Sequence, residues 1–334
     1  MRLRLFQLFA LAGLILLAGP LSAQDWVVPR TVDGKPDLQG IWSNATQTPM
    51  QRPEEFGDKG FLTETEARDQ EQGWKDRITR YSQPSDPDRA PPTDGNTDAG
   101  YNGFWIDRGT DVIEINGQYR TSIVVDPSDG QIPYLEGFQS NALTNQLRAI
   151  PGVDPYDGHE LRPLGERCLL AFGSSSGPPM LPVMYNNNYQ IVQTPDHILI
   201  MVEMVHDARI IPLNKDRSEI HLNKWMGDSV GYWDGDVLVV ETKNFNQYQS
   251  YRGSSPELLV TERFELIGQN KIRYSFTMDD DQSYQQPWTG EIAMNRRPDG
   301  DRMYEYACHE GNYAFPGILG GARRLEQQAA QADQ

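Results

Sequence analysis

Hydrophobic and polar residues alternate in the second half of the chain, in pairs of short segments separated by turn residues. Three such pairs predict β-hairpins: residues 231–233 with 237–242, 259–266 with 271–278, and 288–294 with 303–307. The first pair flanks Asp234-Gly235, a dipeptide typical of tight hairpin turns. In residues 271–278 the apolar side chains fall on one face and the polar ones on the other. Because no helical segment separates the hairpins, the pattern predicts an antiparallel meander, which removes its free edges by closing into a barrel.

The chain before residue 206 predicts less regular structure. Its weaker β segments are residues 112–116, 119–125, 189–193 and 198–205. Residues 126–187 are rich in turns and prolines, with one expected helix at 141–150, so they predict a long capping loop. The sequence Thr63-Glu64-Thr65-Glu66 is typical of a helix start, and the charged residues up to Tyr81 predict a solvated helix.

The predicted fold class is therefore all-β: an antiparallel meander closed or nearly closed into a lipocalin-like barrel, with a long capping loop and peripheral helices. Four regions are expected along the chain: a signal peptide at 1–23, an N-terminal extension at 24–110 with one exposed helix and a Pro/Asp-rich loop, a barrel domain at 111–320 that includes the capping loop 126–187, and a polar C-terminal tail at 321–334.

The N-terminus has the pattern of a secretory signal peptide. Arg2 and Arg4 precede an apolar run at 5–17, and small residues lead to Ala23, after which cleavage is expected. An uncleaved N-terminal anchor is the alternative. No other stretch approaches the roughly 20 apolar residues of a spanning helix, so the sequence predicts a periplasmic or secreted protein without membrane insertion after cleavage.

The charge balance narrows the choice of partners. The chain has 30 Lys and Arg against 47 Asp and Glu, a net charge of -17, which becomes -19 once Arg2 and Arg4 leave with the signal peptide. This balance disfavours nucleic acid and anionic membrane surfaces, which bind basic faces. A small-molecule ligand is the expected partner.

Two cysteines, Cys168 and Cys308, follow the signal peptide. In an oxidising compartment an even pair predicts a disulfide, here one that ties a loop to the barrel wall, whereas two buried thiols are the alternative. No Cys or His spacing typical of a structural zinc site is present.

The densest group of reactive side chains is the segment from Glu203 to Arg209. If the preceding strand continued with a period of two, Glu203, Asp207 and Arg209 would point one way and His206 the other. One hypothesis is a site at a barrel mouth with His206 as general acid or base and Arg209 holding a negative charge. An ion-paired strand end with a hydrogen-bonded histidine is the alternative.

A second candidate segment runs from Tyr304 to Tyr313 and contains His309, Glu310 and Asn312. A histidine and a glutamate directly after a disulfide-bonded Cys308 would be held rigidly, as a preorganised site requires. A strand that leaves the barrel into a polar turn is the alternative. His206 and Asp207 with His309 and Glu310 could also hold a metal ion, but no spacing requires one, and no metal is predicted.

The end of the capping loop, from Tyr185 to Gln190, places three asparagines between tyrosines. Such residues bind polyol hydroxyls through hydrogen bonds and ring stacking, although asparagine also suits left-handed turns. The candidate ligand-binding residues are Tyr185, Asn186, Asn188, Glu203 and Asn312.

Four stretches resemble one family of secreted bacterial proteins without an established activity: PDLQGIW at 36–42, YNNNYQIVQ at 185–193, EMVHDARIIP at 203–212 and YEYACHEGNY at 304–313. The resemblance covers nearly the whole chain after the signal peptide and implies one family architecture, with no catalytic residue to transfer. Separately, Gly40-Ile41-Trp42 is similar to the Gly-x-Trp of lipocalins, whose chains are shorter.

The sequence therefore predicts a periplasmic or secreted barrel that binds a small polar or amphipathic molecule. If it is an enzyme, a hydrolase or lyase with a histidine acid or base is expected; a non-catalytic lipocalin-type binding protein and a structural envelope protein are the alternatives. The chain contains no GxSxG, P-loop or GxGxxG motif, so no cofactor is predicted.

Overall fold

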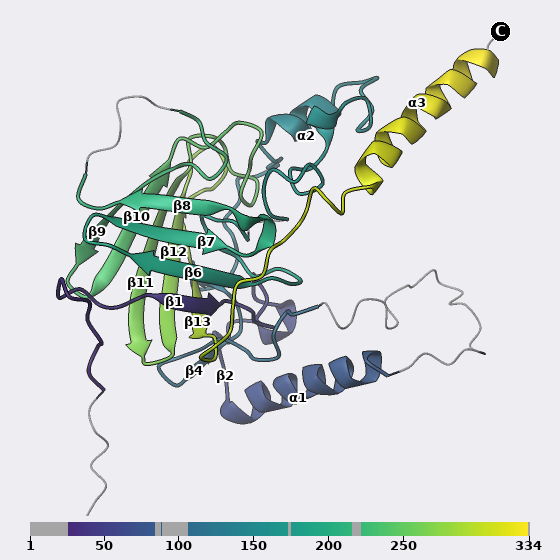
Figure 1. Ribbon diagram of the computed structural model, residues 1–334. Coiled ribbons are helices and arrows are strands. Elements are labelled where there is room, and N and C mark those ends of the chain that lie inside the picture. The colour runs from purple at the N-terminus through teal and green to yellow at the C-terminus, as the bar shows by residue number, and fades with distance from the viewer. Residues whose placement is uncertain (1–25, 84–87, 89–105, 173–174, 216–221, 333–334) are drawn as a thin grey trace, which may run out of the picture.

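The computed structural model describes residues 26–83, 88, 106–172, 175–215 and 222–332. It confirms the all-β fold class: a large antiparallel sheet is nearly closed into a barrel, and the helices lie at its periphery (Figure 1). The predicted signal peptide and most of the Pro/Asp-rich loop lie outside the described residues. No helix in the described part of the chain is long and apolar enough to cross a membrane.

Nine strands follow one another around the barrel, in the order β8 (Ala208–Pro212), β7 (His197–Val202), β6 (Asn188–Gln193), β1 (Gly40–Ser43), β13 (Trp288–Arg296), β12 (Lys271–Asp279), β11 (Leu259–Gly268), β10 (Val237–Lys243) and β9 (Asp228–Asp234). Each neighbouring pair is antiparallel. Leu213, directly after β8, bridges to Gly231 of β9 and brings the two ends of the sheet together. A tenth strand, β5 (Val124–Asp126), pairs with the start of β13.

The alternation predicted for residues 271–278 holds along β12, where buried and half-buried positions alternate, and β11 alternates in the same way. Phe264 pairs with Tyr274 and Leu266 with Ile272, and all four side chains are buried. The two hairpins β9–β10 and β11–β12 are confirmed.

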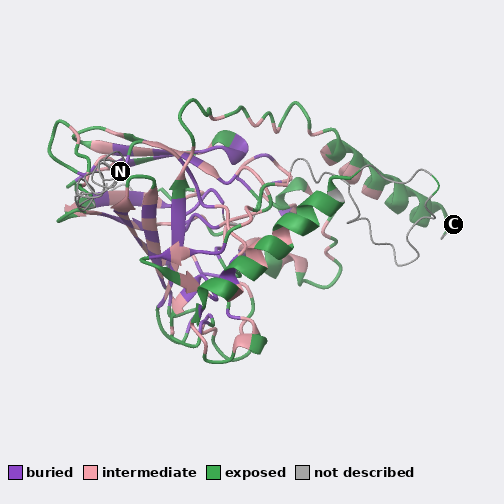
Figure 2. Cartoon of the chain, turned by 90° about the horizontal axis from the view of Figure 1, so that it is seen from below, coloured by how far each residue is buried: buried purple, intermediate pink, exposed green. Residues whose placement is uncertain are grey.

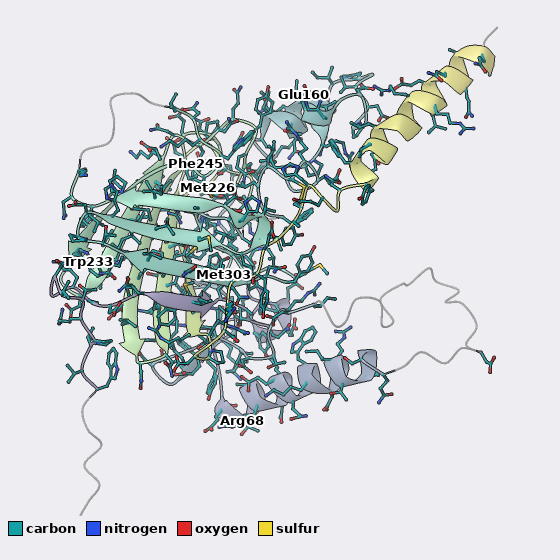
Figure 3. All side chains as sticks on the ribbon, in the orientation of Figure 1. Arg68, Glu160, Met226, Trp233, Phe245 and Met303 are labelled. Carbon is teal, nitrogen blue, oxygen red and sulfur yellow. A yellow bond between two sulfur atoms is a disulfide. The ribbon has the colours of Figure 1, made fainter. Side chains whose placement is uncertain are left out.

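The third predicted hairpin is wrong. β13 pairs with β12 on one side and with β1 on the other, and Trp42 of β1 lies opposite Arg296. β1 therefore occupies the edge of β13 with which residues 303–307 were expected to pair. Pro298, two residues after the end of β13, also lacks the backbone N–H that a continuing strand would need. Residues 297–313, all of them described, form no strand; we call them the C-terminal strap. Figure 3 labels Met303 on this strap, between the end of β13 and helix α3 (Ala314–Ala332).

The remaining elements lie beside the barrel. A small sheet contains β2 (Phe61–Leu62), β4 (Gln118–Arg120) and β3 (Glu114–Ile115). Three α-helices are described, α1 (Glu64–Tyr81), α2 (Leu143–Arg148) and α3, with short 3-10 turns at Glu54–Phe56, His159–Leu161 and Met204–His206. The predicted start of α1 is confirmed by a capping box between Thr63 and Glu66. Helix α3 begins at Ala314, before the predicted tail at 321, and Figure 2 shows that it is largely exposed, whereas the buried positions gather in the barrel.

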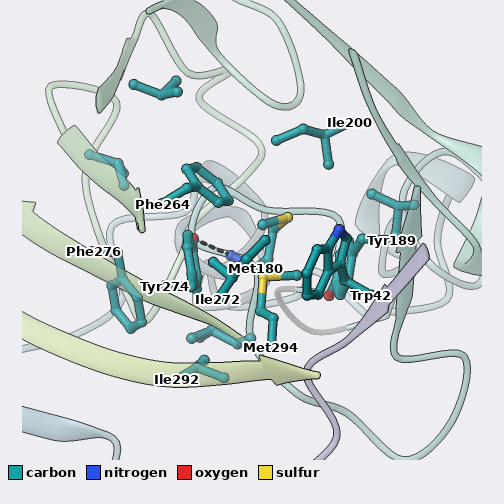
Figure 4. Packing of buried hydrophobic residues seen from close by; sticks show 14 of the residues in the cluster. Trp42, Met180, Tyr189, Ile200, Phe264, Ile272, Tyr274, Phe276, Ile292 and Met294 are labelled. Atoms are coloured by element: carbon teal, nitrogen blue, oxygen red, sulfur yellow. Dashed lines mark hydrogen bonds between the residues drawn. The ribbon is translucent and has the colours of Figure 1, made fainter. Parts of the chain in front are cut away.

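Part of the predicted capping loop enters the barrel and fills its interior. Residues 175–181, which we call the plug, are all buried. The backbone N–H of Met180 donates to Tyr274 Oη at 2.9 Å, and Tyr251 Oη donates to the carbonyl of Gly177 at 2.7 Å. Figure 4 shows Met180 between Tyr274 and Trp42 in the packed core. The interior is thus a core filled by the chain itself.

Arg296 and Trp42 pack together beside Gly40. The guanidinium of Arg296 lies over the Trp42 ring, 4.1 Å from its centroid, and Arg296 Nη1 donates to the carbonyl of Gln39 at 2.8 Å. Gly40 has a φ of 133°, and a Cβ there would overlap Arg296 Nη1. Glycine at this position therefore follows from both backbone conformation and close packing.

Candidate functional site

Glu203 is a buried carboxylate at the end of β7. Its backbone N–H donates to the carbonyl of Asn188, which continues the β6–β7 pairing by one residue. Asn188 Nδ2 donates to Glu203 Oε2 at 2.6 Å, and the backbone N–H of Tyr304 donates to Oε1 at 3.2 Å. The residue is 4% exposed, and no lysine, arginine or histidine nitrogen of the described residues pairs with it. Two neutral donors thus fix a carboxylate that has no cationic partner in the described chain.

The residues after Glu203 leave the strand. Val205 and His206 have φ values of 62° and 50°, the left-handed region that is unfavourable for a β-branched valine. This turn interrupts the expected period of two. On a continuous strand Met204 and His206 would share one side, but Met204 is buried and His206 is exposed. The left-handed turn separates Glu203, which directly follows β7, from the start of β8 at Ala208.

Arg209 lies inside the barrel. Its Nη1 donates to Glu262 Oε1 at 3.0 Å, and its Nη2 donates to Glu262 Oε2, which joins β8 to β11 through the interior. Burial alone would lower the pKa of Arg209, but the Glu262 carboxylate outweighs it and raises the pKa. Tyr274 Oη donates to the same carboxylate at 2.8 Å, and burial together with Glu262 raises its pKa. Arg209 thus has a carboxylate partner within the core.

Asp207 contacts the plug. Ser176 Oγ donates to Asp207 Oδ2 at 3.0 Å, and Ser176 is buried. Burial raises the pKa of the half-buried Asp207, and Ser176 and the neighbouring His206 partly oppose that effect. Asp207 therefore belongs to the contact between plug and barrel.

The predicted disulfide between Cys168 and Cys308 is confirmed, across a sequence separation of 140. Next to it, Asn312 Nδ2 donates to the carbonyl of Glu166 at 2.7 Å. His309 and Glu310, directly after Cys308, are exposed in a turn. The disulfide fastens the C-terminal strap to the capping loop.

A groove of about 1080 Å³ opens between the barrel end, the C-terminal strap and the start of α3. We call it the rim groove. Four of the five predicted ligand-binding residues line it: Tyr185, Asn186, Glu203 and Asn312. The fifth, Asn188, does not line the groove but donates a hydrogen bond to Glu203. None of the predicted catalytic residues His206, Asp207, Arg209, His309 and Glu310 is among the described residues that line the groove.

Several lining residues were missed in the sequence. They are mainly aromatic or apolar: Phe172, Tyr304, Tyr306, Phe315 and Ile318. Phe315 and Ile318 had a signal, since a spacing of three places both on one face of a helix. Tyr304 and Tyr306 have no such signal, because residues 303–307 have the pattern of a strand that the structure does not form. Burial and a hydrogen bond with Tyr185 raise the pKa of Tyr306 to about 12, so this phenol stays neutral in the groove near neutral pH.

No protein-family model, curated protein or solved structure matches this chain. Its chemistry must therefore be inferred from the groove itself.

The rim groove has an acidic and aromatic lining. Its carboxylates are Glu166, Glu203 and Glu305, and the described lining contains no lysine, arginine or histidine. Glu166 already pairs with Arg162 at 2.8 Å, so Glu203 is the buried carboxylate that a ligand could reach. The described residues contain no group of three or more His, Cys, Asp or Glu side chains arranged to hold a metal ion.

Proposed function

We propose that this protein binds a small polar or amphipathic molecule in the rim groove, as a periplasmic or secreted binding protein. One observation carries the proposal: the disulfide Cys168–Cys308 fastens a strap without strand pairing across the barrel end, and a groove of about 1080 Å³ lies beneath it. Ligand pockets commonly have volumes of about 300–1,000 Å³ and combine apolar walls with a few placed polar groups. The rim groove has both features.

The position of this groove differs from a lipocalin-type cavity. The plug occupies the barrel interior, where Met180 and Leu181 are buried among the strands. A ligand is therefore proposed to bind beside the barrel end, between Tyr185 and the strap. A hydrolase or lyase reaction has weaker support, because neither His206 nor His309 is among the described residues that line the groove. No contact observed in the described chain favours a structural envelope role.

The proposal is tested by blocking the groove. Gly311 lines it without a left-handed backbone, and the nearest atom to a Cβ there is the Ala307 carbonyl oxygen at 3.8 Å. Gly311→Trp should therefore fill the groove without strain at the backbone. Gly73→Trp is the matched control, since Gly73 lies in α1 with nothing within 4 Å of its Cβ position.

The measurement is the shift in melting temperature with a panel of phenolics, steroids, sugars and alkylamines. A compound at a hundredfold excess over its Kd stabilises the folded state by about 2.7 kcal/mol. We expect at least one compound to stabilise the wild type and Gly73→Trp but not Gly311→Trp. Equal shifts in both tryptophan variants would place the binding site elsewhere.

A further inference from the structure

Glu203 combines burial with the absence of a counter-ion. It is 4% exposed, yet the groups that hold it in the described chain are the neutral side chain of Asn188 and the backbone N–H of Tyr304. A buried carboxylate is normally paired or neutralised, because desolvation of an unpaired charge is costly. The other wall of this site is the open groove.

The carboxylate also retains hydrogen-bonding capacity. An ionised carboxylate has about four lone-pair positions, and Glu203 uses one on each oxygen. The remaining positions suit an N–H donor with a positive charge, since charge-assisted hydrogen bonds are the stronger kind.

Aromatic residues surround the same space. Tyr185, Tyr304, Tyr306, Phe172 and Phe315 line the groove, and the faces of aromatic rings attract cations. The described lining holds no basic side chain that would repel a cation or bind an anion. The net charge of -17 gives the whole molecule a negative electrostatic potential, which also attracts cations. Burial, aromatic lining and charge thus point to one ligand class.

We propose that the ligand of the rim groove is an amphipathic amine, bound as its ammonium form with the N–H groups on Glu203 and its apolar body against the aromatic walls. This inference rests on the proposed function, since it names the ligand class of the same groove. It predicts that a cation is selected over a neutral or anionic molecule of the same shape.

The test uses three probes that share one body: 4-phenylbutylamine, 4-phenyl-1-butanol and 4-phenylbutyrate. Their Kd values are measured by calorimetry on the full oxidised protein at neutral pH and 0.15 M salt, which screens surface charges beyond about 8 Å. For the wild type we expect the amine to bind about tenfold more tightly than the alcohol or more, the effect of one charge-assisted hydrogen bond. The carboxylate should bind most weakly.

Glu203→Gln should remove this preference and bring the amine to the affinity of the alcohol. The variant can keep its contacts, because Asn188 Oδ1 has no hydrogen-bond partner and can accept from the new amide once the Asn188 side chain turns over. Glu265→Gln is the control: it removes one negative charge on β11 outside the groove, and it should leave all three affinities unchanged.

The outcomes separate the two proposals. If the alcohol binds the wild type as tightly as the amine and Gly311→Trp abolishes both, the groove binds ligands but the amine inference is wrong. Retention of the amine preference in Glu203→Gln would also overturn the inference. If no probe shows binding that Gly311→Trp abolishes, the amine inference is overturned. The compound panel then decides separately whether the groove binds a ligand.

Discussion

The barrel interior and the rim groove each contain a buried glutamate, but the two residues have different surroundings. Glu262 is inaccessible and accepts hydrogen bonds from Arg209 and Tyr274, so its charge is paired and its oxygens are occupied. Glu203 is almost as buried, yet it accepts only neutral donors in the described chain and borders a groove of about 1080 Å³. Two carboxylates that are almost equally buried thus differ in whether the chain itself supplies a counter-charge.

The difference lies in what compensates the charge. The Glu262–Arg209 pair joins two strands through the core, and Tyr274 extends it to the plug through the Met180 N–H. The charge of each partner is thus compensated by the other inside the barrel. Glu203 has no such partner in the described chain, and the proposed ammonium ligand would supply the counter-charge from the groove. The comparison predicts that Glu262 matters for folding and Glu203 for binding.

The largest effect should follow from breaking the interior pair. Glu262→Gln leaves the Arg209 guanidinium buried without a counter-charge, and removing one partner of a buried pair costs about 3–5 kcal/mol of unfolding free energy. Urea unfolding followed by tryptophan fluorescence measures the loss. Glu265→Gln, on the same strand, breaks the half-exposed pair with Arg273 and should cost less than about 1 kcal/mol.

Glu203→Gln is the contrasting arm of this experiment. It removes an unpaired buried charge, so its unfolding free energy should equal or exceed that of the wild type. The comparison would fail if Glu203→Gln lost as much stability as Glu262→Gln, because Glu203 would then be a second structural carboxylate.

An intermediate effect is expected at the disulfide. Cys168→Ser with Cys308→Ser opens a loop with a sequence separation of 140 and should lower the unfolding free energy by about 2–5 kcal/mol. The variant should also weaken ligand binding in the rim groove, because the strap has no strand pairing to hold it. Reduction of the wild type should reproduce both changes. Unchanged binding in the double serine variant would mean that the strap does not shape the site.

Much of the barrel could be predicted because its signals are local. The Asp234-Gly235 turn and the alternation around Tyr274 depend on neighbours in sequence, and both hairpins form as expected. The pairing of β13 with β1 could not be predicted, because it joins residues more than 250 positions apart. The missed plug has the same cause: Met180 is buried by strands far away in the sequence.

The candidate site divides in the same way. Tyr185, Asn186, Glu203 and Asn312 were selected by residue type and do line one groove. The grouping of Glu203 with Arg209 assumed a continuous strand, and the left-handed residues Val205 and His206 separate the two. No local sequence pattern predicts that a valine will adopt a left-handed backbone conformation.

Asp207 is intermediate between Glu262 and Glu203 in this comparison, and we expect its substitution to have the smallest effect on the unfolding free energy. It is half-buried and accepts from Ser176 of the plug, and burial raises its pKa above the ordinary value of 3.8. A raised pKa means that the folded state holds the proton more tightly than the unfolded state, so stability falls as pH rises from about 4 through the folded-state pKa and is level above it. Asp207→Asn should remove this decline, and its stability relative to the wild type should therefore increase across that window.

Asp236→Asn gives a control of opposite sign. Arg30 lowers the pKa of Asp236 through a hydrogen bond, so the stability that the wild-type carboxylate contributes is lost as pH falls. Urea unfolding at several pH values from 3 to 7 measures both trends, and a parallel pH profile for wild type and Asp207→Asn would show that burial of Asp207 carries no cost.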